Sequence, residues 1–329
     1  MLRVGLLGAG RIGRIHGGNV AAHPKAQLVA VADASLEASQ TVAAETGATV
    51  GTIDGILQDG GIDAVLICTP TDMHADLIEK ACQAGKAVFC EKPVDLDAQR
   101  IRACLKVVED CGGQLMIGFN RRFDPNFAAL RRRLWDGEAG EVEIVSVISR
   151  DPAPPPVDYV KRSGGLFRDM MIHDLDMARF LLGEEPVEVY AVGSALVDPA
   201  IGAAGDVDTA AVLLKTASGR IAQISNSRRA TYGYDQRVEV HGSKGMIRAG
   251  NVHESTVEVA TASGFQADPV QNFFLQRYAE AYRLELDAFV TSVTEKSPFS
   301  PSGEDGLKAQ ILADAATESV RTGAPVRVG

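Results

Sequence analysis

Two short motifs carry side chains that could move a proton and stabilise a developing negative charge. Lys92 stands between Glu91 and Pro93, directly after an apolar run. Asp169 and His173 are four residues apart in a second motif, so on a helix they would share one face. A carboxylate beside an imidazole orients the ring and raises its basicity, as a general base near neutral pH requires. An ammonium group donates hydrogen bonds to an oxygen on which charge develops. These residue types therefore favour general acid–base chemistry.

Each motif also has an interpretation without catalysis. Lys92 could form a salt bridge with its neighbour Glu91, and His173 could be a hydrogen-bonded histidine of the core. A metal site is a third alternative for His173, since imidazole and carboxylate groups are both ligands. One histidine with scattered carboxylates lacks the spacing of a zinc site, and the five cysteines include no C-x-x-C pair. We therefore expect no bound metal.

A glycine-rich motif near the start of the chain predicts a dinucleotide site. Gly8, Gly10 and Gly13 match G-x-G-x-x-G between a strand-like run and a helix-like stretch. The first glycine permits a tight turn, the second leaves room for a pyrophosphate and the third lets helix and strand pack closely. Asp33 follows Gly13 by 20 residues, where a carboxylate binds ribose hydroxyls and repels a 2′-phosphate. The motif predicts NAD rather than NADP, although Asp33 could instead cap the helix that starts near Ser35.

The elements that must position these residues begin with alternating strands and helices in the first third of the chain. Short apolar runs predict strands at residues 2–7, 28–32, 64–68, 87–90 and 115–117, with helical stretches such as 73–84 and 96–111 between them. This alternation predicts a doubly wound parallel sheet of the Rossmann type. Ligands of such sheets bind beyond the carboxyl ends of the strands. Two loops that follow apolar strands there, Thr69-Pro70 and Glu91-Lys92-Pro93, are candidates for contacts to the ribose and nicotinamide.

The pattern changes after residue 120, where longer alternating runs predict half-buried strands. These strands lie at residues 142–149, 187–192, 211–214, 220–225, 237–241 and 256–260. Helices at 165–182, 272–291 and 303–322 would cover one side of a large, mainly antiparallel sheet. We therefore expect an NAD-binding Rossmann domain at 1–120 and an α+β domain for substrate binding and oligomerisation at 121–329. The open face of its sheet would be covered by another subunit, and we expect a homotetramer; a monomer with a polar open face is the alternative.

The overall composition excludes several classes of partner. The 329 residues are enough for two domains, and the net charge of −10 disfavours nucleic acids and membrane surfaces as partners. A strand-like run starts at the second residue, which leaves no room for a signal peptide. The cysteines suggest no disulfide framework. We therefore expect a cytoplasmic protein.

The motifs together resemble the Gfo/Idh/MocA oxidoreductase family along essentially the whole chain. The resemblance rests on Gly8–Gly13, Glu91-Lys92-Pro93, and Gly164-Gly165 followed by Asp169 and His173. Two further segments, 118–125 and 168–182, are similar to the branch of the family that oxidises inositols. The resemblance implies hydride transfer from a ring hydroxyl of a cyclic polyol to NAD. It also implies catalytic roles for Lys92, Asp169 and His173.

The same resemblance implies residues that contact the ligands. Substrate hydroxyls would be bound by His173, Arg122, Asp151 and Tyr232, whereas Asp176 would shape its helix. The cofactor-binding set is Gly8, Gly10, Arg11, Ile12, Gly13, Asp33, Thr69, Pro70, His74, Glu91 and Lys92. Two alternatives remain at this stage. One is the same chemistry on another inositol isomer, glucose or a sugar acid, and the other is a nucleotide-binding regulatory module without turnover.

Overall fold

The computed structural model describes residues 1–328, which divide into two compact units. The first unit combines Met1–Phe123 with Ala281–Gln310, and the second combines Asp124–Glu280 with the residues from Ile311 onward. Among the described residues, no helix has both the length and the apolar character needed to cross a bilayer.

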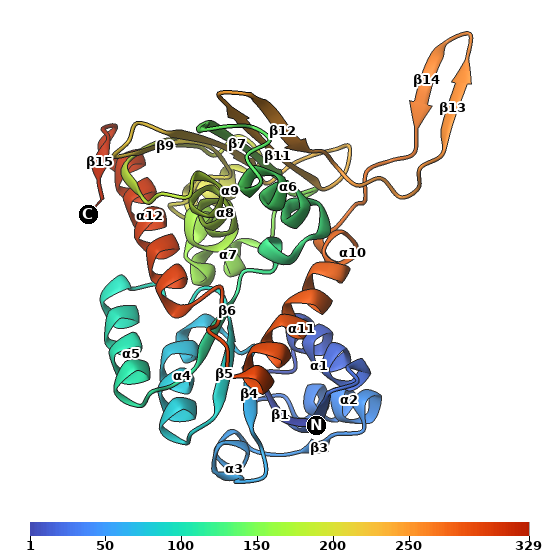
Figure 1. The fold of residues 1–329 in the computed structure, drawn as a ribbon, viewed down its shortest axis with the longest axis vertical. Coiled ribbons are helices and arrows are strands. Elements are labelled where there is room, and N and C mark those ends of the chain that lie inside the picture. Colours follow the sequence, from blue (N-terminus) through green and yellow to red (C-terminus); the bar gives the residue numbers. More distant parts are fainter. Residues whose placement is uncertain (329) are drawn as a thin grey trace. The chain divides into compact units, whose positions relative to one another are not determined.

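The first unit contains a six-stranded parallel sheet. Its order is β3-β2-β1-β4-β5-β6, which is the Rossmann arrangement expected from the sequence. The strands are β1 (Leu2–Leu7), β2 (Ala26–Ala32), β3 (Thr49–Val50), β4 (Ala64–Ile67), β5 (Ala87–Glu91) and β6 (Leu115–Gly118). The helical elements between and after them are α1 (Arg11–Ala22), α2 (Leu36–Thr46), α3 (Ile53–Gln58), η1 (Thr71–Met73), α4 (His74–Gln83), α5 (Ala98–Asp110) and η2 (Asn120–Phe123) (Figure 1).

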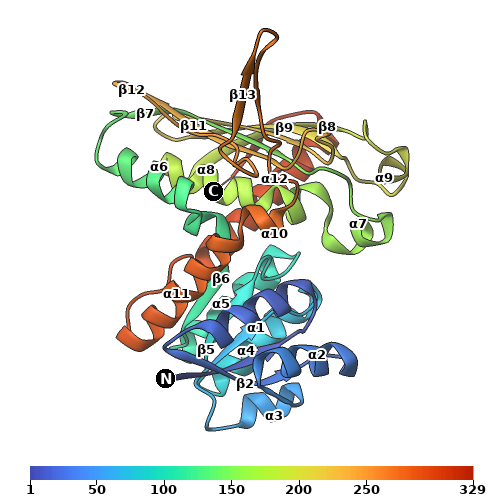
Figure 2. The same cartoon turned by 90° about the vertical axis from the view of Figure 1, so that its right-hand side faces the viewer.

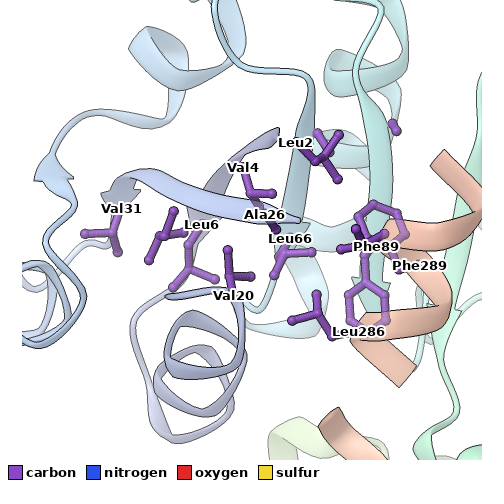
Figure 3. Packing of buried hydrophobic residues seen from close by; sticks show 14 of the residues in the cluster. Leu2, Val4, Leu6, Val20, Ala26, Val31, Leu66, Phe89, Leu286 and Phe289 are labelled. Carbon is purple, nitrogen blue, oxygen red and sulfur yellow. The ribbon is translucent and has the colours of Figure 1, made fainter. Parts of the chain in front are cut away.

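A helix from late in the chain completes the core of this unit. Leu286, Phe289 and Val290 of α11 (Ala279–Glu295) belong to the same buried cluster as Leu66 and Phe89 of the sheet (Figure 3). The rings of Phe89 and Phe289 lie 5.8 Å apart in an edge-on arrangement. The prediction that a helix over 272–291 covers the second sheet was therefore wrong for most of that segment. Its apolar face is buried against the Rossmann sheet instead.

The second unit contains a seven-stranded mixed sheet. Its order is β12-β11-β7-β10-β9-β8-β15, and every neighbouring pair is antiparallel except β10 with β7. The predicted large, mainly antiparallel sheet is thus confirmed. Its strands are β7 (Val142–Arg150), β8 (Pro186–Ser194), β9 (Thr209–Thr216), β10 (Ile221–Ser227), β11 (Asp235–Gly242), β12 (Gly245–Ala249) and β15 (Val326–Arg327).

Helices of the second unit lie on one side of this sheet (Figure 2). The helical elements are α6 (Pro125–Trp135), α7 (Val157–Ser163), the π-helical turn η3 (Leu166–Met170), α8 (Ile172–Leu182), α9 (Pro199–Ala203), α10 (Phe274–Arg277) and the later part of α12 (Gly303–Thr322). The strand expected at 256–260 does not join the sheet. It forms a separate exposed hairpin of β13 (Glu258–Thr261) and β14 (Gly264–Ala267).

Burial of Glu285 within the core of the first unit is the main anomaly of the fold. Its side chain projects from α11 and is completely buried, yet its carboxyl oxygens make no hydrogen bond with any of residues 1–328. A carboxylate oxygen of Glu285, a carboxylate oxygen of Glu91 and a ring nitrogen of His16 all lie within 4.8 Å of one another. His16 Nε2 and Glu91 Oε1 are hydrogen-bonded at 2.7 Å. Burial, aided by the charge of Glu91, raises the pKa of Glu285 well above its ordinary value.

A Glu285→Gln substitution should change the pH dependence of stability. Because the folded-state pKa is raised, the carboxyl stabilises the fold fully only below its unfolded pKa of about 4.3. That contribution is lost as the pH rises through the folded-state value. The Glu285→Gln variant has no titratable group at this position. As the pH increases, its free energy of unfolding should therefore rise relative to that of the wild type. The gain should grow as the pH rises toward the folded-state pKa of Glu285.

Urea unfolding between pH 5.5 and 7.5, in steps of roughly half a unit, measures this difference. Glu295→Gln, at an exposed position near the end of the same helix, is the matched control and should show no pH-dependent gain. A Glu285→Gln curve that runs parallel to the wild type across this range would contradict a raised pKa for Glu285.

Candidate active site

The glycine-rich turn between β1 and α1 has the shape of a dinucleotide cradle. Gly8 adopts a φ of +97°, and a Cβ there would press on the Cys68–Thr69 backbone. A Cβ at Gly13 would overlap the carbonyl oxygen of Gly8. A Cβ at Gly10, by contrast, would meet no atom within 4 Å. Packing inside the protein thus explains two of the three glycines, whereas Gly10 leaves open space at the N-terminus of α1, where phosphates bind favourably.

Asp33 connects the end of β2 to this turn. Its Oδ2 accepts a hydrogen bond from the N–H of Ala9 at 2.6 Å, and its Oδ1 accepts one from the N–H of Ser35 at 2.7 Å. The N-cap of α2 is Ser35, whose hydroxyl accepts from the N–H of Ala38. The alternative role of Asp33 as the helix cap is therefore not observed. Arg11 and Ile12 form the first turn of α1, directly after Gly10.

His74 ties together two loops at the carboxyl edge of the first sheet. Its Nδ1 lies 2.8 Å from the carbonyl oxygen of Pro93, and its Nε2 lies 2.7 Å from that of Thr69. The side chain is buried, and this burial lowers the pKa of His74 despite the two carbonyl contacts. The imidazole therefore fixes the loop that contains Thr69 and Pro70 relative to the loop that follows β5.

Lys92 follows β5 directly and is half-buried. The preceding Glu91 is held by His16 of α1, as described above. Arg122 lies in η2, just after β6, and its Nη2 forms an ion pair with Asp305 Oδ1 at 2.9 Å. All the predicted cofactor-binding residues thus belong to the first unit, mostly in loops after its strands, as the parallel topology requires.

Asp169 and His173 belong to the second unit, where a π-helical turn precedes α8. The prediction of one regular helix over 165–182 was wrong: η3 contains Asp169, and α8 begins at Ile172, one residue before His173. In a π turn the N–H bonds five residues back, as Met171 does to Leu166. Asp169 Oδ1 accepts a hydrogen bond from Tyr159 Oη at 3.0 Å, and its Oδ2 lies 3.5 Å from Arg228 Nη2.

The other predicted substrate contacts lie near the ends of strands in the second unit. Asp151 follows β7, and its N–H donates to the carbonyl of Ser227 at 3.0 Å. Tyr232 donates to Asp235 Oδ2 at 2.6 Å and accepts from Arg150 at 3.0 Å. Burial opposes ionisation of Asp235, but hydrogen bonds from Arg237, Tyr232 and Asn251 hold its pKa below the ordinary value.

Sequence reasoning missed three residues of these networks. His16 lies three residues after Gly13 on α1. This spacing indicates that the two residues share one face of the helix, so the position of His16 could have been predicted. Arg228 continues the inward alternation of β10, which was also detectable. Glu285 carried no local signal, because its neighbours His16 and Glu91 lie far away in the sequence.

Asp176, which was expected to shape its helix, forms an ion pair within that helix. Its Oδ1 lies 3.5 Å from Nη1 of Arg179.

Two protein-family models match this chain, one over the parallel sheet of the first unit and one over most of the mixed sheet of the second. Residues 2–119 match "Oxidoreductase family, NAD-binding Rossmann fold", and residues 127–248 match "GFO/IDH/MocA C-terminal domain".

The chain is also similar to individual proteins over nearly its whole length. It is 59% identical over 319 residues to the inositol 2-dehydrogenase of Rhizobium meliloti (strain 1021), with 97% of each chain covered. It is 44% identical over 321 residues to the myo-inositol 2-dehydrogenase of Thermotoga maritima, with 97% of this chain and 96% of that protein covered.

A crystal structure with ligands has the same fold. The scyllo-inositol dehydrogenase of Lactobacillus casei, with bound NAD(H) and scyllo-inositol, is 32% identical and superposes with a TM-score of 0.93 over 99% of each chain. Since the strand order, the glycine cradle and both family models agree, the chain belongs to the Gfo/Idh/MocA family of NAD-binding oxidoreductases.

Proposed function

We propose that this protein is an NAD-dependent inositol 2-dehydrogenase, which oxidises a ring hydroxyl of myo-inositol or a close isomer to the 2-keto product. The observation that carries the proposal is the 59% identity to the inositol 2-dehydrogenase of Rhizobium meliloti over 97% of both chains. A protein of inositol catabolism with five unpaired cysteines fits a reducing cytoplasm.

The residues present fit NAD. The open space at Gly10 leaves room for a pyrophosphate at the N-terminus of α1, and Asp33 supplies a carboxylate beside the turn for the ribose hydroxyls. The bound coenzyme supplies the hydride acceptor. In this proposal residues 1–120 hold it, and residues 121–329 provide most contacts to the substrate.

The chain's own residues handle the proton and the developing charge. His173 removes the proton of the reacting hydroxyl, and Asp169 supports the imidazolium that results. Lys92 donates a hydrogen bond to the oxygen as it becomes a carbonyl. Arg122, Asp151 and Tyr232 bind further ring hydroxyls. A neutral polyol is recognised by directed hydrogen bonds to its hydroxyl groups rather than by a cluster of positive charges.

A second candidate substrate is scyllo-inositol, because a 38% identical relative is named scyllo-inositol 2-dehydrogenase (NAD(+)). Initial rates with NAD and a panel of myo-, scyllo- and chiro-inositol, glucose and sugar acids separate these substrates. A panel with no turnover at all would favour a regulatory nucleotide-binding module.

We also propose a homo-oligomer, with a tetramer as the expected form, built through the open face of the second sheet. Side chains alternating away from the helices leave exposed apolar residues on that face, including Ile144, Tyr190, Val192, Leu213 and Ile221. Apolar side chains exposed on an open sheet face are costly in water, and such a face suits an identical face of a second copy.

Replacement of Lys92 or His173 by alanine should lower kcat by about 10²–10⁴-fold, which is far more than either change should weaken the binding of NAD. NADH formation gives kcat, and quenching of protein fluorescence gives the Kd. Lys80→Ala, at an exposed position of α4, should behave as the wild type. Near-normal turnover of either site variant would remove that residue from the mechanism.

Asp33→Asn should relax the preference for NAD. The amide oxygen can still accept the hydrogen bond from Ala9 although the one from Ser35 is lost, and the charge that repels a 2′-phosphate is gone. The ratio of kcat/KM for NADP to that for NAD should rise by about tenfold or more, which corresponds to roughly 1.4 kcal/mol. An unchanged ratio would refute the role of this carboxylate.

Leu213→Glu should weaken the proposed subunit contact, because it replaces an exposed apolar side chain of this sheet face with a charge. Sedimentation velocity should then detect species smaller than the wild-type assembly. Leu36→Glu replaces another exposed leucine, on α2 of the first unit, and should leave the mass unchanged. Equal masses for Leu213→Glu and the wild type would exclude this face as the interface.

A further inference from the structure

The inward face of β10 changes from apolar to charged toward its C-terminal end. Ala222, Ile224 and Asn226 alternate on this face, and all three are buried. Arg228 continues the alternation just beyond the strand, and its side chain is only 2% exposed. An arginine is rarely buried to this extent unless another charge or a ligand compensates for its lost hydration.

The guanidinium of Arg228 faces the carboxylate of Asp169. Nη2 lies 3.5 Å from Oδ2, whereas Oδ1 accepts the hydrogen bond from Tyr159 at 3.0 Å. Both oxygens of Asp169 therefore have a defined neighbour. The neighbours come from different elements, since Tyr159 is part of α7 and Arg228 follows β10.

The hydrogen bonding of Arg228 differs from that of buried arginines with a purely structural role. Its Nε and Nη2 donate no hydrogen bond to any of residues 1–328, although a guanidinium normally makes a fork of such bonds. By comparison, Asn226 on the same face ties β10 to α8 through a 2.9 Å hydrogen bond to Asp174. Unsatisfied buried donors require an explanation, and a functional role is one of the established ones.

A second carboxyl group shares the positive charge of Arg228. Asp206 accepts hydrogen bonds from the N–H of Leu166 with both oxygens, at 3.0 and 3.2 Å. Its oxygens also pack where a Cβ of Gly165 would lie, so glycine is required there. Burial raises the pKa of Asp206, and the charge of Asp169 adds to this, whereas the N–H bonds and Arg228 oppose it. The charge of Arg228 thus acts on Asp206 as well as on Asp169.

We propose that Arg228 is a positioning residue of the active site, which holds the carboxylate of Asp169 in place while Asp169 supports the protonated His173. The inference rests on the proposed function, because it assigns a task to a neighbour of Asp169. In this proposal Arg228 acts through Asp169, with which it is paired.

Arg228→Met, which keeps much of the side-chain length but removes the charge, should lower kcat by about 100-fold. The Kd for NAD should stay within about twofold of the wild type, since the coenzyme residues belong to the other unit. Arg228→Lys restores the charge without the fork and should recover at least about tenfold in kcat over the methionine variant. A methionine variant with kcat within about threefold of the wild type would overturn the proposal.

Arg277→Met is the matched control for loss of a buried arginine. Arg277 is also 2% exposed and is paired with Asp124, within the same unit. Its loss should lower the unfolding midpoint while kcat stays near the wild-type value. If kcat of Arg277→Met falls as far as that of Arg228→Met, the effect is one of general stability and the proposal fails.

A double variant covers the case in which Arg228→Met does not fold. Combining it with Asp206→Asn removes a carboxylate together with the guanidinium, so less charge is buried without a partner. The proposal expects kcat of the folded double variant to stay about 100-fold low. Recovery of wild-type kcat would mean that Arg228 only neutralises Asp206.

The coupling between Arg228 and Asp169 separates this inference from the proposed function. In an Asp169→Asn background, Arg228→Met should lower kcat by no more than about threefold, since residues that act as a unit are not additive. A further loss of about 100-fold would overturn the proposal. If the wild-type protein oxidises no inositol, the proposed function fails. If the wild type is active and Arg228→Met is equally active, only this inference fails.

Discussion

A charged group buried at the end of a strand loses most of its hydration, so its position depends on partners that other elements supply. In the first unit, Glu91 ends β5 and is held by His16 of α1, with Glu285 of α11 close to both. In the second unit, Arg228 follows β10 and faces Asp169 of η3. The sheets therefore bring chemistry-bearing residues to their edges, but helices from elsewhere in the chain fix the orientation of those side chains.

Local chemistry allowed much of the fold and the coenzyme cradle to be predicted. The turn at Gly8, the close approach at Gly13 and the open space at Gly10 depend on residues within one strand–turn–helix unit. Five of the six strands of the Rossmann sheet are likewise recognisable, because strands buried on both faces read as continuous apolar runs, whereas the exposed two-residue strand β3 carries no such run. The placement of Asp33 after β2 follows from the same local spacing.

The remaining features depend on contacts between distant segments. Helical periodicity indicated that α11 has an apolar face, but it could not identify which apolar surface covers Leu286 and Phe289. The π turn at η3 depends on Gly165 packing against Asp206, a residue about 40 positions away. Glu285 looks like an ordinary helical glutamate until its burial beside Glu91 is seen. Sequence patterns specify elements and strand ends, whereas they leave the pairing of buried charges undetermined.

Hydride transfer from an inositol carbon to NAD can be followed directly with an isotope label. The wild-type protein is incubated with NAD and myo-inositol that carries deuterium on the carbon to be oxidised, and the reduced coenzyme is isolated for mass spectrometry. The account predicts one deuterium per molecule of NADH and none released to water. NADH without the label, or no NADH while NAD remains bound, would contradict it.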